Sequence, residues 1–253
     1  MKTISVMNVK GGVGKTITAV NVAHILATEY DSRVLLIDAD AQADATAMLY
    51  EDEPEETSGL YGAMVYGGVA DLYLDRTKYP GLDIVTASSD LFYISMSDSE
   101  AMTKTMKDFL ESVSHDYDFC IVDCPPSFSA PSVAAICNSD SVIIPVKLDA
   151  FGLRACRFLV DQVEAMHEFN PSVKVAGALA TMYHNCEVCN QALQLLDKSG
   201  IHVFETRIRR TDKADESTFF QMALSEYSRY SSAGRDYRCF VSEFLEGGHE
   251  NGI

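Results

Sequence analysis

The chain has 253 residues, of which 47% are hydrophobic, and a formal net charge of −17 at pH 7. This length suits one large α/β domain, because chains divide into separate domains near roughly 250 to 300 residues. No apolar run approaches the ~18 residues that cross a membrane, so we expect a soluble protein. The negative charge argues against a surface coated with phosphate-binding residues and limits any nucleic-acid binding to a local patch.

The N-terminus and the cysteines both favour a cytoplasmic protein. The first eight residues, MKTISVMN, show no basic region followed by a long apolar region, so no secretory signal is visible. The seven cysteines are scattered and do not form an evenly spaced disulfide framework. We therefore expect a reducing compartment.

The first thirty residues predict a strand, a glycine-rich turn and a helix. The strand is expected over Lys2–Asn8, and helical apolar spacing follows over Ile17–Tyr30. The turn between them reads Val9-Lys10-Gly11-Gly12-Val13-Gly14-Lys15-Thr16. A helix N-terminus leaves backbone N–H groups unpaired and carries a partial positive charge, so a loop wrapped around it binds anions.

Each residue type in this turn suits a nucleotide triphosphate. Gly11, Gly12 and Gly14 permit backbone angles and close approaches that a Cβ would block. The Lys15 ammonium can reach the terminal phosphates, and the Thr16 hydroxyl can ligate Mg²⁺. The turn is therefore predicted to be a phosphate-binding loop.

The loop departs from the usual P-loop in one informative way. The usual motif has a glycine where this chain has Val9, and a second lysine, Lys10, precedes the first glycine. The run KGGVGKT resembles the deviant Walker A P-loop of the ParA/MinD family. The resemblance implies that Lys10 reaches across a dimer interface to the partner's nucleotide, so both Lys10 and Lys15 are catalytic candidates. It implies nucleotide contacts from Lys10, Gly11, Gly12, Val13, Gly14, Lys15, Thr16 and Ile17, although many relatives have a hydroxyl at the last position.

Apolar runs and helical spacing alternate along the rest of the chain. Strands buried on both faces are predicted at Val34–Ile37, Phe119–Val122, Val142–Val146 and Val173–Leu179. Helices are predicted at Val13–Tyr30, Glu100–Ser114, Gly152–Phe169, Glu187–Ser199 and Gly234–Leu245. This pattern predicts an α/β fold with a doubly wound, mostly parallel β-sheet flanked by helices. Residues 51–56 are expected to form an acidic loop, and residues 59–79 give no clear pattern.

Two predicted strands end in carboxylates. The first runs into Asp38-Ala39-Asp40-Ala41, at the strand edge where open α/β sheets bind ligands. The segment DADAQADAT resembles the DxDPQxxxT segment of ParA-type ATPases, with alanine in place of the proline. The resemblance implies that Asp40 positions the attacking water and that Asp38 supports the metal and its hydration shell.

The second of these strands ends at Asp123. This is the Walker B arrangement, in which the aspartate holds Mg²⁺ through water, so the predicted metal residues are Thr16, Asp38 and Asp123. The following Cys124-Pro125-Pro126-Ser127 resembles the switch II segment of ParA proteins. Two prolines fix φ and stiffen this loop.

Two later segments carry weaker resemblances. Ile144-Pro145-Val146 followed by Phe151-Gly152-Leu153 is similar to the region where a helix of ParA proteins begins near the dimer interface. Ile208-Arg209-Arg210-Thr211 stands where the family has an adenine-side I-P-R-N. Arg209 is therefore a candidate for nucleotide binding, although the proline is missing.

The resemblance covers nearly the whole chain, with its most specific motifs in residues 8–46 and 119–153. It implies a single ATPase domain over residues 1–253, without an N-terminal helix-turn-helix extension because the chain starts at the first strand. It implies ATP and Mg²⁺ as cofactors, weak ATP hydrolysis stimulated by a ParB-like partner, and an ATP-dependent homodimer that binds DNA without sequence preference. A cytoplasmic, nucleoid-associated protein that partitions a plasmid, chromosome or mobile element is the resulting expectation.

The positive charge needed for DNA is local. Residues 207–238 contain seven basic and five acidic side chains, a balance of +2 in a strongly acidic chain. Arg235 and Arg238 flank an apolar helical stripe and are expected to shield it. The predicted DNA contacts are therefore Arg207, Arg209, Arg210 and Arg229.

Two alternative functions stay open at this point. Cys186 and Cys189 form a C-x-x-C close to where Mrp-type carriers hold an iron–sulfur cluster between two subunits. A MinD-like membrane ATPase needs a basic amphipathic tail, whereas the last twelve residues, SEFLEGGHENGI, are acidic. We therefore expect no membrane partner.

Overall fold

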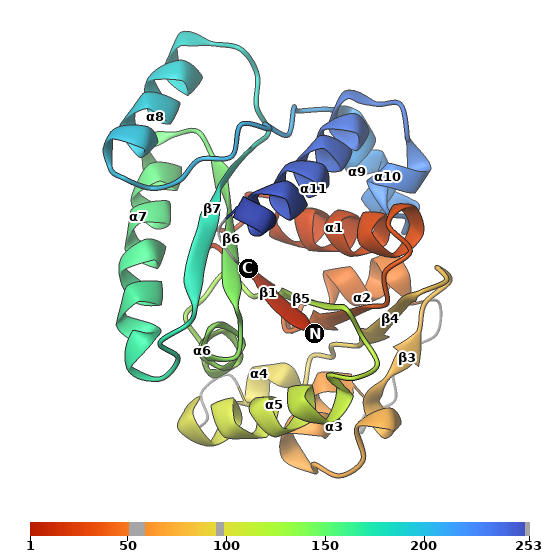
Figure 1. Ribbon diagram of the computed structural model, residues 1–253. Helices are drawn as coiled ribbons and strands as arrows, with labels where there is room; N and C mark the ends of the chain where they lie inside the picture. The colour runs from red at the N-terminus through yellow and green to blue at the C-terminus, as the bar shows by residue number, and fades with distance from the viewer. Residues whose placement is uncertain (51–58, 95–98, 251–253) are drawn as a thin grey trace.

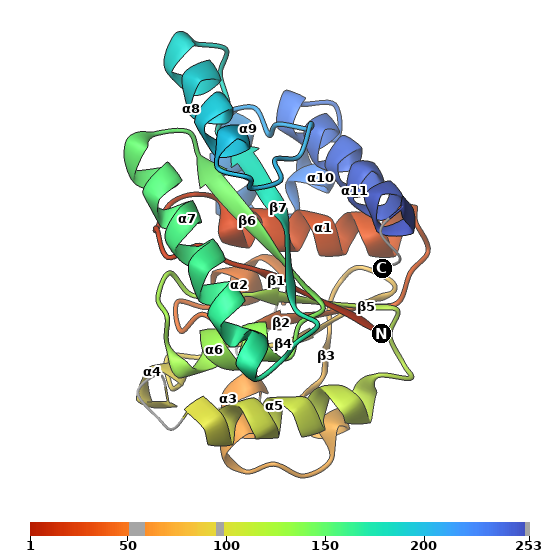
Figure 2. The same cartoon turned by 60° about the vertical axis from the view of Figure 1, so that its left-hand side comes forward.

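The computed structural model describes residues 1–50, 59–94 and 99–250. These residues build a seven-stranded β-sheet with helices on both faces (Figure 1, Figure 2). The strand order is β3-β4-β2-β5-β1-β6-β7, and only the β3–β4 pair is antiparallel. The predicted doubly wound, mostly parallel sheet is confirmed.

The five predicted strands form the main part of this sheet. The strands are β1 (Lys2–Val6), β2 (Val34–Asp38), β3 (Asp75–Arg76), β4 (Leu82–Val85), β5 (Phe119–Asp123), β6 (Ser141–Lys147) and β7 (Lys174–Thr181). The first strand ends two residues before the predicted Asn8, because that side chain already belongs to the following loop. The short strands β3 and β4 at one edge were not predicted.

The five predicted helices are present in the predicted order, whereas the other helices and the 3₁₀ turns were not predicted. The α-helices are α1 (Lys15–Glu29), α2 (Asp44–Leu49), α3 (Gly59–Val65), α4 (Leu91–Ile94), α5 (Ser99–Val113), α6 (Ala130–Cys137), α7 (Ala150–Ala165), α8 (Glu187–Lys198), α9 (Asp212–Phe219), α10 (Leu224–Tyr227) and α11 (Ser232–Glu250). The 3₁₀ turns are η1 (Ala70–Tyr73) and η2 (Met166–Glu168). The stretch 59–79, which gave no pattern, holds α3, η1 and β3. The acidic stretch 51–56 lies outside the described residues.

Three predicted helices differ from the observed ones at one or both ends. Helix α1 begins at Lys15, two residues later than predicted, because Gly14 adopts a left-handed φ of 85° at its N-cap. Helix α7 begins two residues earlier, since the Asp149 side chain caps it, and its last predicted turn is the separate η2. Helix α11 extends beyond the predicted range at both ends.

Each central strand buries both of its faces, which explains the continuous apolar runs. Along β2, Val34 and Leu36 pack with α1 and α11, whereas Leu35 and Ile37 pack on the opposite face. Helices α1, α9, α10 and α11 cover one side of the sheet, and α5, α6 and α7 cover the other (Figure 1, Figure 2). Strand side chains alternate between faces, so two apolar cores require an unbroken apolar sequence.

The parallel strands bring their carboxyl ends to one edge of the sheet. Asp38 at the end of β2 is the register partner of Asp123 at the end of β5, and Val6 of β1 pairs with Asp123 on the other side. The glycine-rich loop leaves β1 at this edge. Within the described residues, no helix combines the length and the apolar character needed to cross a bilayer.

Candidate functional site

Hydrogen bonds at the ends of three neighbouring strands, β1, β6 and β7, fix the shape of the glycine-rich loop. At the end of β1, the Asn8 amide nitrogen donates to the Pro145 carbonyl oxygen over 2.7 Å, and its amide oxygen accepts from the Lys10 N–H over 2.9 Å. On the other side, the Thr181 hydroxyl at the end of β7 donates to the Val13 carbonyl over 2.8 Å. The loop is therefore anchored before any ligand arrives.

The loop ends in an open helix N-terminus. Gly12 and Gly14 have φ of 67° and 85°, in the left-handed region that a side chain disfavours. As the N-cap of α1, Gly14 provides no side-chain hydrogen bond, and the first turn of the helix contains no acidic residue. The backbone N–H groups and the positive end of the helix dipole thus stay available to an anion.

A buried lysine and three carboxylates lie beside this terminus. Burial lowers the pKa of the Lys15 ammonium, whereas the nearby charges of Asp123 and Asp40 raise it. Lys15 is only 7% exposed, so its charge is directed inward. One lysine facing several carboxylates leaves a negative excess, which a divalent cation would balance.

Asp38 organises the turn between β2 and α2. Its Oδ2 accepts hydrogen bonds from the Thr46 N–H at 2.8 Å and the Thr46 hydroxyl at 2.7 Å, and its Oδ1 accepts from the Asp40 N–H at 3.1 Å. Burial raises the pKa of Asp38 to about 6, and the hydrogen bonds from Thr46 and Asp40 oppose this rise. Both oxygens are already engaged, so any part that Asp38 plays toward a metal is indirect.

Asp40 lies in the tight turn that Asp38 organises. It is half-buried, and its Oδ1 accepts from the Gln42 N–H at 3.0 Å. The turn closes at Ala43, which has a left-handed φ of 56° and is the N-cap of α2. The carboxylate is thus held close to Lys15 without being enclosed.

Asp123 has the opposite environment from Asp38. It is 1% exposed, and among the described residues neither of its carboxylate oxygens finds a partner with acceptable hydrogen-bond geometry. Burial raises its pKa well above the ordinary range, neighbouring Asp38 adds to this, and Thr16 and Lys15 oppose it. A bare buried carboxylate is costly, and a hydrated Mg²⁺ would satisfy it with the oxygen ligands that this ion prefers. The residues present therefore fit the predicted metal.

Lys10 is held at the opposite rim of the loop. Its Nζ contacts both carboxylate oxygens of Asp149, at 2.7 and 2.9 Å, and lies 5.9 Å from the centre of the Phe151 ring. Burial alone would raise the pKa of Asp149, but the hydrogen bonds from Lys10 and from the Gly152 N–H lower it. A Cβ at Gly152 would lie 2.0 Å from the Lys147 carbonyl oxygen, so only glycine fits there. The structure thereby brings the predicted segment 151–153 to the P-loop.

A cavity of about 290 Å³ opens next to the start of α1. Gly14 and Ile17 line one side of this cavity, and the segment 208–211 lines another. Arg209 is fixed in this wall by Asp236, whose carboxylate accepts from its Nε at 2.9 Å and from its terminal nitrogen at 2.6 Å. Sequence reasoning missed Met182, His184 and Tyr237, which complete the wall from the loop after β7 and from α11.

The four predicted DNA-contacting arginines are all exposed. Arg207 lies over the Tyr183 ring, 5.1 Å from its centre, and Arg209 is paired with Asp236. Arg210 precedes α9 and Arg229 follows α10, and both side chains are exposed.

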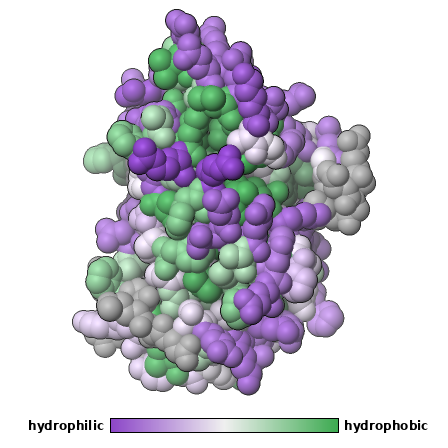
Figure 3. Space-filling model, turned by 90° about the vertical axis from the view of Figure 1, so that its left-hand side faces the viewer, coloured by the Kyte–Doolittle hydropathy of each residue, from purple (hydrophilic) through white to green (hydrophobic). Residues whose placement is uncertain are grey.

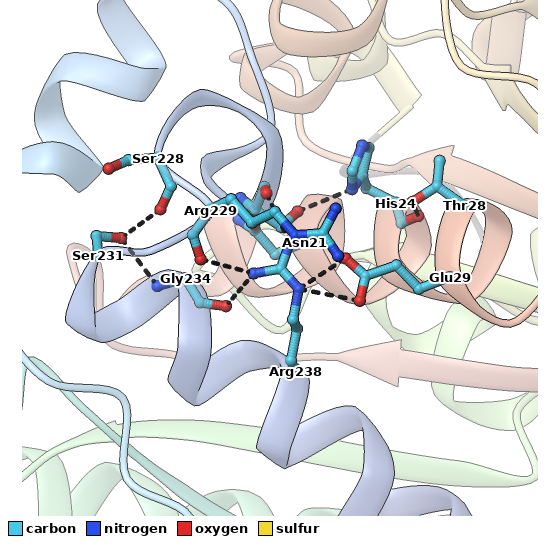
Figure 4. Close-up of polar contacts among 10 residues, drawn as sticks. Asn21, His24, Thr28, Glu29, Ser228, Arg229, Ser231, Gly234 and Arg238 are labelled. Atoms are coloured by element: carbon cyan, nitrogen blue, oxygen red, sulfur yellow. Dashed lines mark hydrogen bonds and ion pairs between the residues drawn. The ribbon is translucent and has the colours of Figure 1, made fainter.

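Arg238, which was predicted to shield its helix, is largely buried, with 19% of its side chain exposed. Its Nε contacts both carboxylate oxygens of Glu29, at 2.6 and 2.9 Å. Its other nitrogens donate to the carbonyls of Ser225, Arg229 and Gly234 (Figure 4). The Arg238 guanidinium is therefore held by hydrogen bonds and an ion pair at the contact between α1 and α11.

Known proteins resemble this chain over nearly its full length. A family model described as an AAA domain matches residues 1–175. The sporulation initiation inhibitor protein Soj of Bacillus subtilis is 33% identical, covering 98% of this chain and 99% of Soj. The chromosome partitioning protein ParA of Caulobacter vibrioides is 28% identical, covering 97% of this chain and 94% of that protein.

Solved structures share the fold. Apo McdA of Cyanothece superposes with a TM-score of 0.87 at 20% identity, covering 97% of this chain and 99% of McdA. A putative plasmid partition protein of Borrelia burgdorferi bound to AMPPNP gives a TM-score of 0.85 at 21% identity, with coverage of 97% and 99%. The family model spans more than half of the chain and the Soj match spans almost all of it, so this chain belongs to the ParA/Soj branch of the ParA/MinD-type P-loop ATPases.

Proposed function

We propose that the chain is a partition ATPase, a single catalytic unit that binds ATP with Mg²⁺, dimerises on ATP and then binds DNA without sequence preference. The observation that carries the proposal is the bare, buried carboxylate of Asp123 beside Lys15 and Thr16, at an open helix N-terminus. Such a carboxylate needs a hydrated cation, and such a helix end needs an anion. A metal–triphosphate meets both needs at once.

The nucleotide is placed by the loop and the neighbouring cavity. The phosphates lie against the N–H groups at the start of α1, where the buried Lys15 ammonium pairs with them. The base enters the cavity between Ile17 and the segment 208–211, whose Arg209 is fixed by Asp236. The shape of this pocket exists before binding, because Asn8 and Thr181 anchor the loop.

The carboxylates have separate roles in metal binding and in positioning the attacking water. When bound, Mg²⁺ neutralises charge on the phosphates and on the acidic cluster. Thr16 and Asp123 hold the ion, and Asp38 supports its hydration shell indirectly. Asp40 accepts a hydrogen bond from the attacking water and orients it toward the terminal phosphorus, whose bond to the bridging oxygen breaks to leave ADP and phosphate.

Dimerisation completes the site. Lys10 lies at the rim of the loop beside Phe151, which is 68% exposed. Apolar side chains gather on the face that α7 and α8 present (Figure 3), including exposed Phe158, Val188 and Leu195. A second copy that covers this rim would meet Lys10, which could then leave Asp149 for the partner's phosphates. A ParB-like protein would stimulate ATP hydrolysis by the dimer, which binds the nucleoid in the cytoplasm.

The two lysines provide the test of this proposal. Lys15→Ala should abolish ATP binding, because it removes the cation that faces the phosphates of its own subunit. Lys10→Ala should bind ATP within a few-fold of the parent protein but neither dimerise nor hydrolyse it. Equilibrium nucleotide titration, sedimentation with ATP and phosphate release measure the three properties.

Lys213→Ala serves as the matched control, since within the described part of the chain this exposed lysine forms its ion pair with neighbouring Glu216 on α9. It should behave as the parent protein in all three assays. If Lys10→Ala dimerises with ATP and hydrolyses it at the parent rate, the role given to Lys10 is wrong. If Lys15→Ala binds ATP normally, the P-loop assignment itself fails.

The iron–sulfur carrier is not favoured. The named relatives reported above are partitioning and sporulation proteins, and the two cysteines do not stand alone. His184 of the same chain converges on Cys186 and Cys189. Three ligands from one chain point to a local site and not to a cluster shared through two cysteines from each subunit.

A further inference from the structure

Three metal-binding side chains meet in the segment between β7 and α8. His184, Cys186 and Cys189 each offer one ligand atom, and these atoms all lie within 4.8 Å of one another. The two sulfur atoms are 3.0 Å apart. We propose that these residues form a mononuclear divalent metal site of the zinc type, separate from the Mg²⁺ site at the P-loop.

The observed separations suit such an ion after a small adjustment. Zinc binds sulfur at about 2.3 Å and imidazole nitrogen at about 2.0 to 2.1 Å, so a tetrahedral angle places two ligating sulfurs roughly 3.8 Å apart. The two sulfurs must therefore separate by a little less than ~1 Å, which rotation about the side-chain bonds of Cys186 and Cys189 provides. No backbone movement is required for the pair.

The local backbone prepares the two sulfurs as ligands. Cys186 is the N-cap residue of α8, and its Sγ accepts a hydrogen bond from the Cys189 N–H at 3.2 Å. A helix N-terminus stabilises negative charge, so it favours the thiolate form that binds metal. Cys189 is 4% exposed and His184 is exposed. The ion would enter from the histidine side, where its fourth position faces water.

Ligand chemistry separates this site from the one at the P-loop. Two thiolates and an imidazole select zinc-like ions, whereas the hydroxyl and carboxylate oxygens of Thr16 and Asp123 select Mg²⁺. The same chain can therefore hold both ions without competition. All three soft ligands come from one subunit, so occupancy needs no second copy.

The site also adjoins the wall of the nucleotide cavity. Met182 and His184 line that cavity, and Thr181 holds the Val13 carbonyl of the P-loop. A bound ion would tie the loop 182–186, which joins β7 to α8, to the first turn of α8. Metal occupancy thereby stabilises one side of the nucleotide pocket.

Cobalt titration tests the proposal without ATP, so its outcome is independent of the proposed ATPase function. The full chain, reduced with a phosphine and stripped with a chelator, is titrated with Co²⁺, whose thiolate complexes absorb in the near ultraviolet. We expect one equivalent to bind per chain and to be displaced by Zn²⁺. Cys186→Ser and Cys189→Ala should abolish the thiolate absorption, and His184→Ala should keep it with an affinity lowered at least ten-fold.

Cys239→Ser is the matched control, because this exposed cysteine lies on α11. It should bind Co²⁺ as the parent protein does. Circular dichroism checks that each variant is folded, and His184→Ala changes only an exposed side chain. Absence of the band in the reduced parent chain, its persistence in both cysteine variants, or stoichiometric iron and sulfide in protein purified without oxygen would each overturn the mononuclear site.

Discussion

His24 shows how burial controls the charge of a single residue. It lies on α1, 6% exposed, with its Nδ1 2.8 Å from the Ser225 hydroxyl and its ring edge-on to Tyr79 at 4.5 Å. Figure 4 places it on the same helix as Glu29, close to Arg238. Burial lowers its pKa to about 4, although the charges of Glu226 and Glu29 raise it. The imidazole is therefore neutral in the folded protein at pH 7.

This residue should make the protein sensitive to acid. The folded pKa of about 4 lies below the ordinary 6.5, so the unfolded chain binds the proton more readily and stability falls as the pH drops from 6.5 toward 4. Between pH 7.5 and pH 5 the loss from His24 should be about 2 kcal/mol. Urea unfolding at both pH values should show this difference in the parent chain and not in His24→Asn.

The exposed His115 supplies the comparison. His115→Asn should lose stability between the two pH values as the parent chain does. If His24→Asn shows the same pH dependence as the parent, His24 is not held neutral by burial and the assignment is wrong.

At the scale of an element, the turn from β2 to α2 separates a structural aspartate from a functional one. Asp38 is enclosed by hydrogen bonds from Thr46, whose hydroxyl oxygen also accepts from the Ala87 N–H at 2.9 Å. Among the described residues, the Asp40 carboxylate accepts only a turn hydrogen bond, from the Gln42 N–H, and it lies near Lys15. The first carboxylate holds the turn in shape so that the second can act.

Two substitutions should separate these roles. Thr46→Val keeps the side-chain shape but leaves the Ala87 N–H unpaired and Asp38 short of a donor, which should destabilise the protein by about 1 to 3 kcal/mol. Asp40→Ala should change the free energy of unfolding by less than about 0.5 kcal/mol, retain ATP binding and abolish hydrolysis. Chemical denaturation and phosphate release provide the two measurements. Retained turnover in Asp40→Ala would move the water-positioning role to another carboxylate.

For the whole molecule, the net negative charge makes the exposed C-terminal arginines important for any DNA binding. The net charge is −17, and the structure divides the C-terminal arginines by environment. Arg238 forms an ion pair with Glu29, and Arg209 forms an ion pair with Asp236 in the cavity wall. Arg207, Arg210 and Arg229 stay exposed. A monomer therefore offers a weak patch, and an ATP dimer would double it.

DNA binding should accordingly depend on ATP. Replacing Arg207, Arg210 and Arg229 together by alanine should weaken binding to unrelated duplexes about equally. It should also reduce the salt slope by about one for each phosphate that an arginine no longer neutralises. ATP binding should be unchanged. Fluorescence anisotropy with and without ATP, at two salt concentrations, measures both effects.

Arg235→Ala is the control within the same region, because this exposed arginine on α11 is expected only to shield its helix. It should bind DNA as the parent chain does. Tight binding without nucleotide, or no binding with it, would contradict the DNA-tethering mechanism while leaving the ATPase assignment intact.

The sequence by itself determined the central sheet and the identity of the loop. Strands β2, β5 and β6 are buried on both faces, so each contains an unbroken or nearly unbroken apolar run, and β1 and β7 follow from their β-branched and small apolar residues. The P-loop and each carboxylate segment are short runs of neighbouring residues that can be recognised in the sequence. Parallel strands necessarily bring their carboxyl ends to one edge of the sheet. Strands β3 and β4, at one end of the sheet, escaped prediction, since β3 is only Asp75–Arg76 and β4 spans four residues.

Tertiary structure decided how chemically identical residues differ. Asp38 and Asp123 both end apolar strands, yet one is saturated with hydrogen bonds and the other has none with acceptable geometry among the described residues. Lys10 contacts Asp149, which is 139 residues away in the sequence, and Arg238 contacts Glu29, which is 209 residues away. These partners are set by which elements the fold places side by side. Burial and hydrogen bonding depend on such neighbours, and no local pattern in the sequence encodes them.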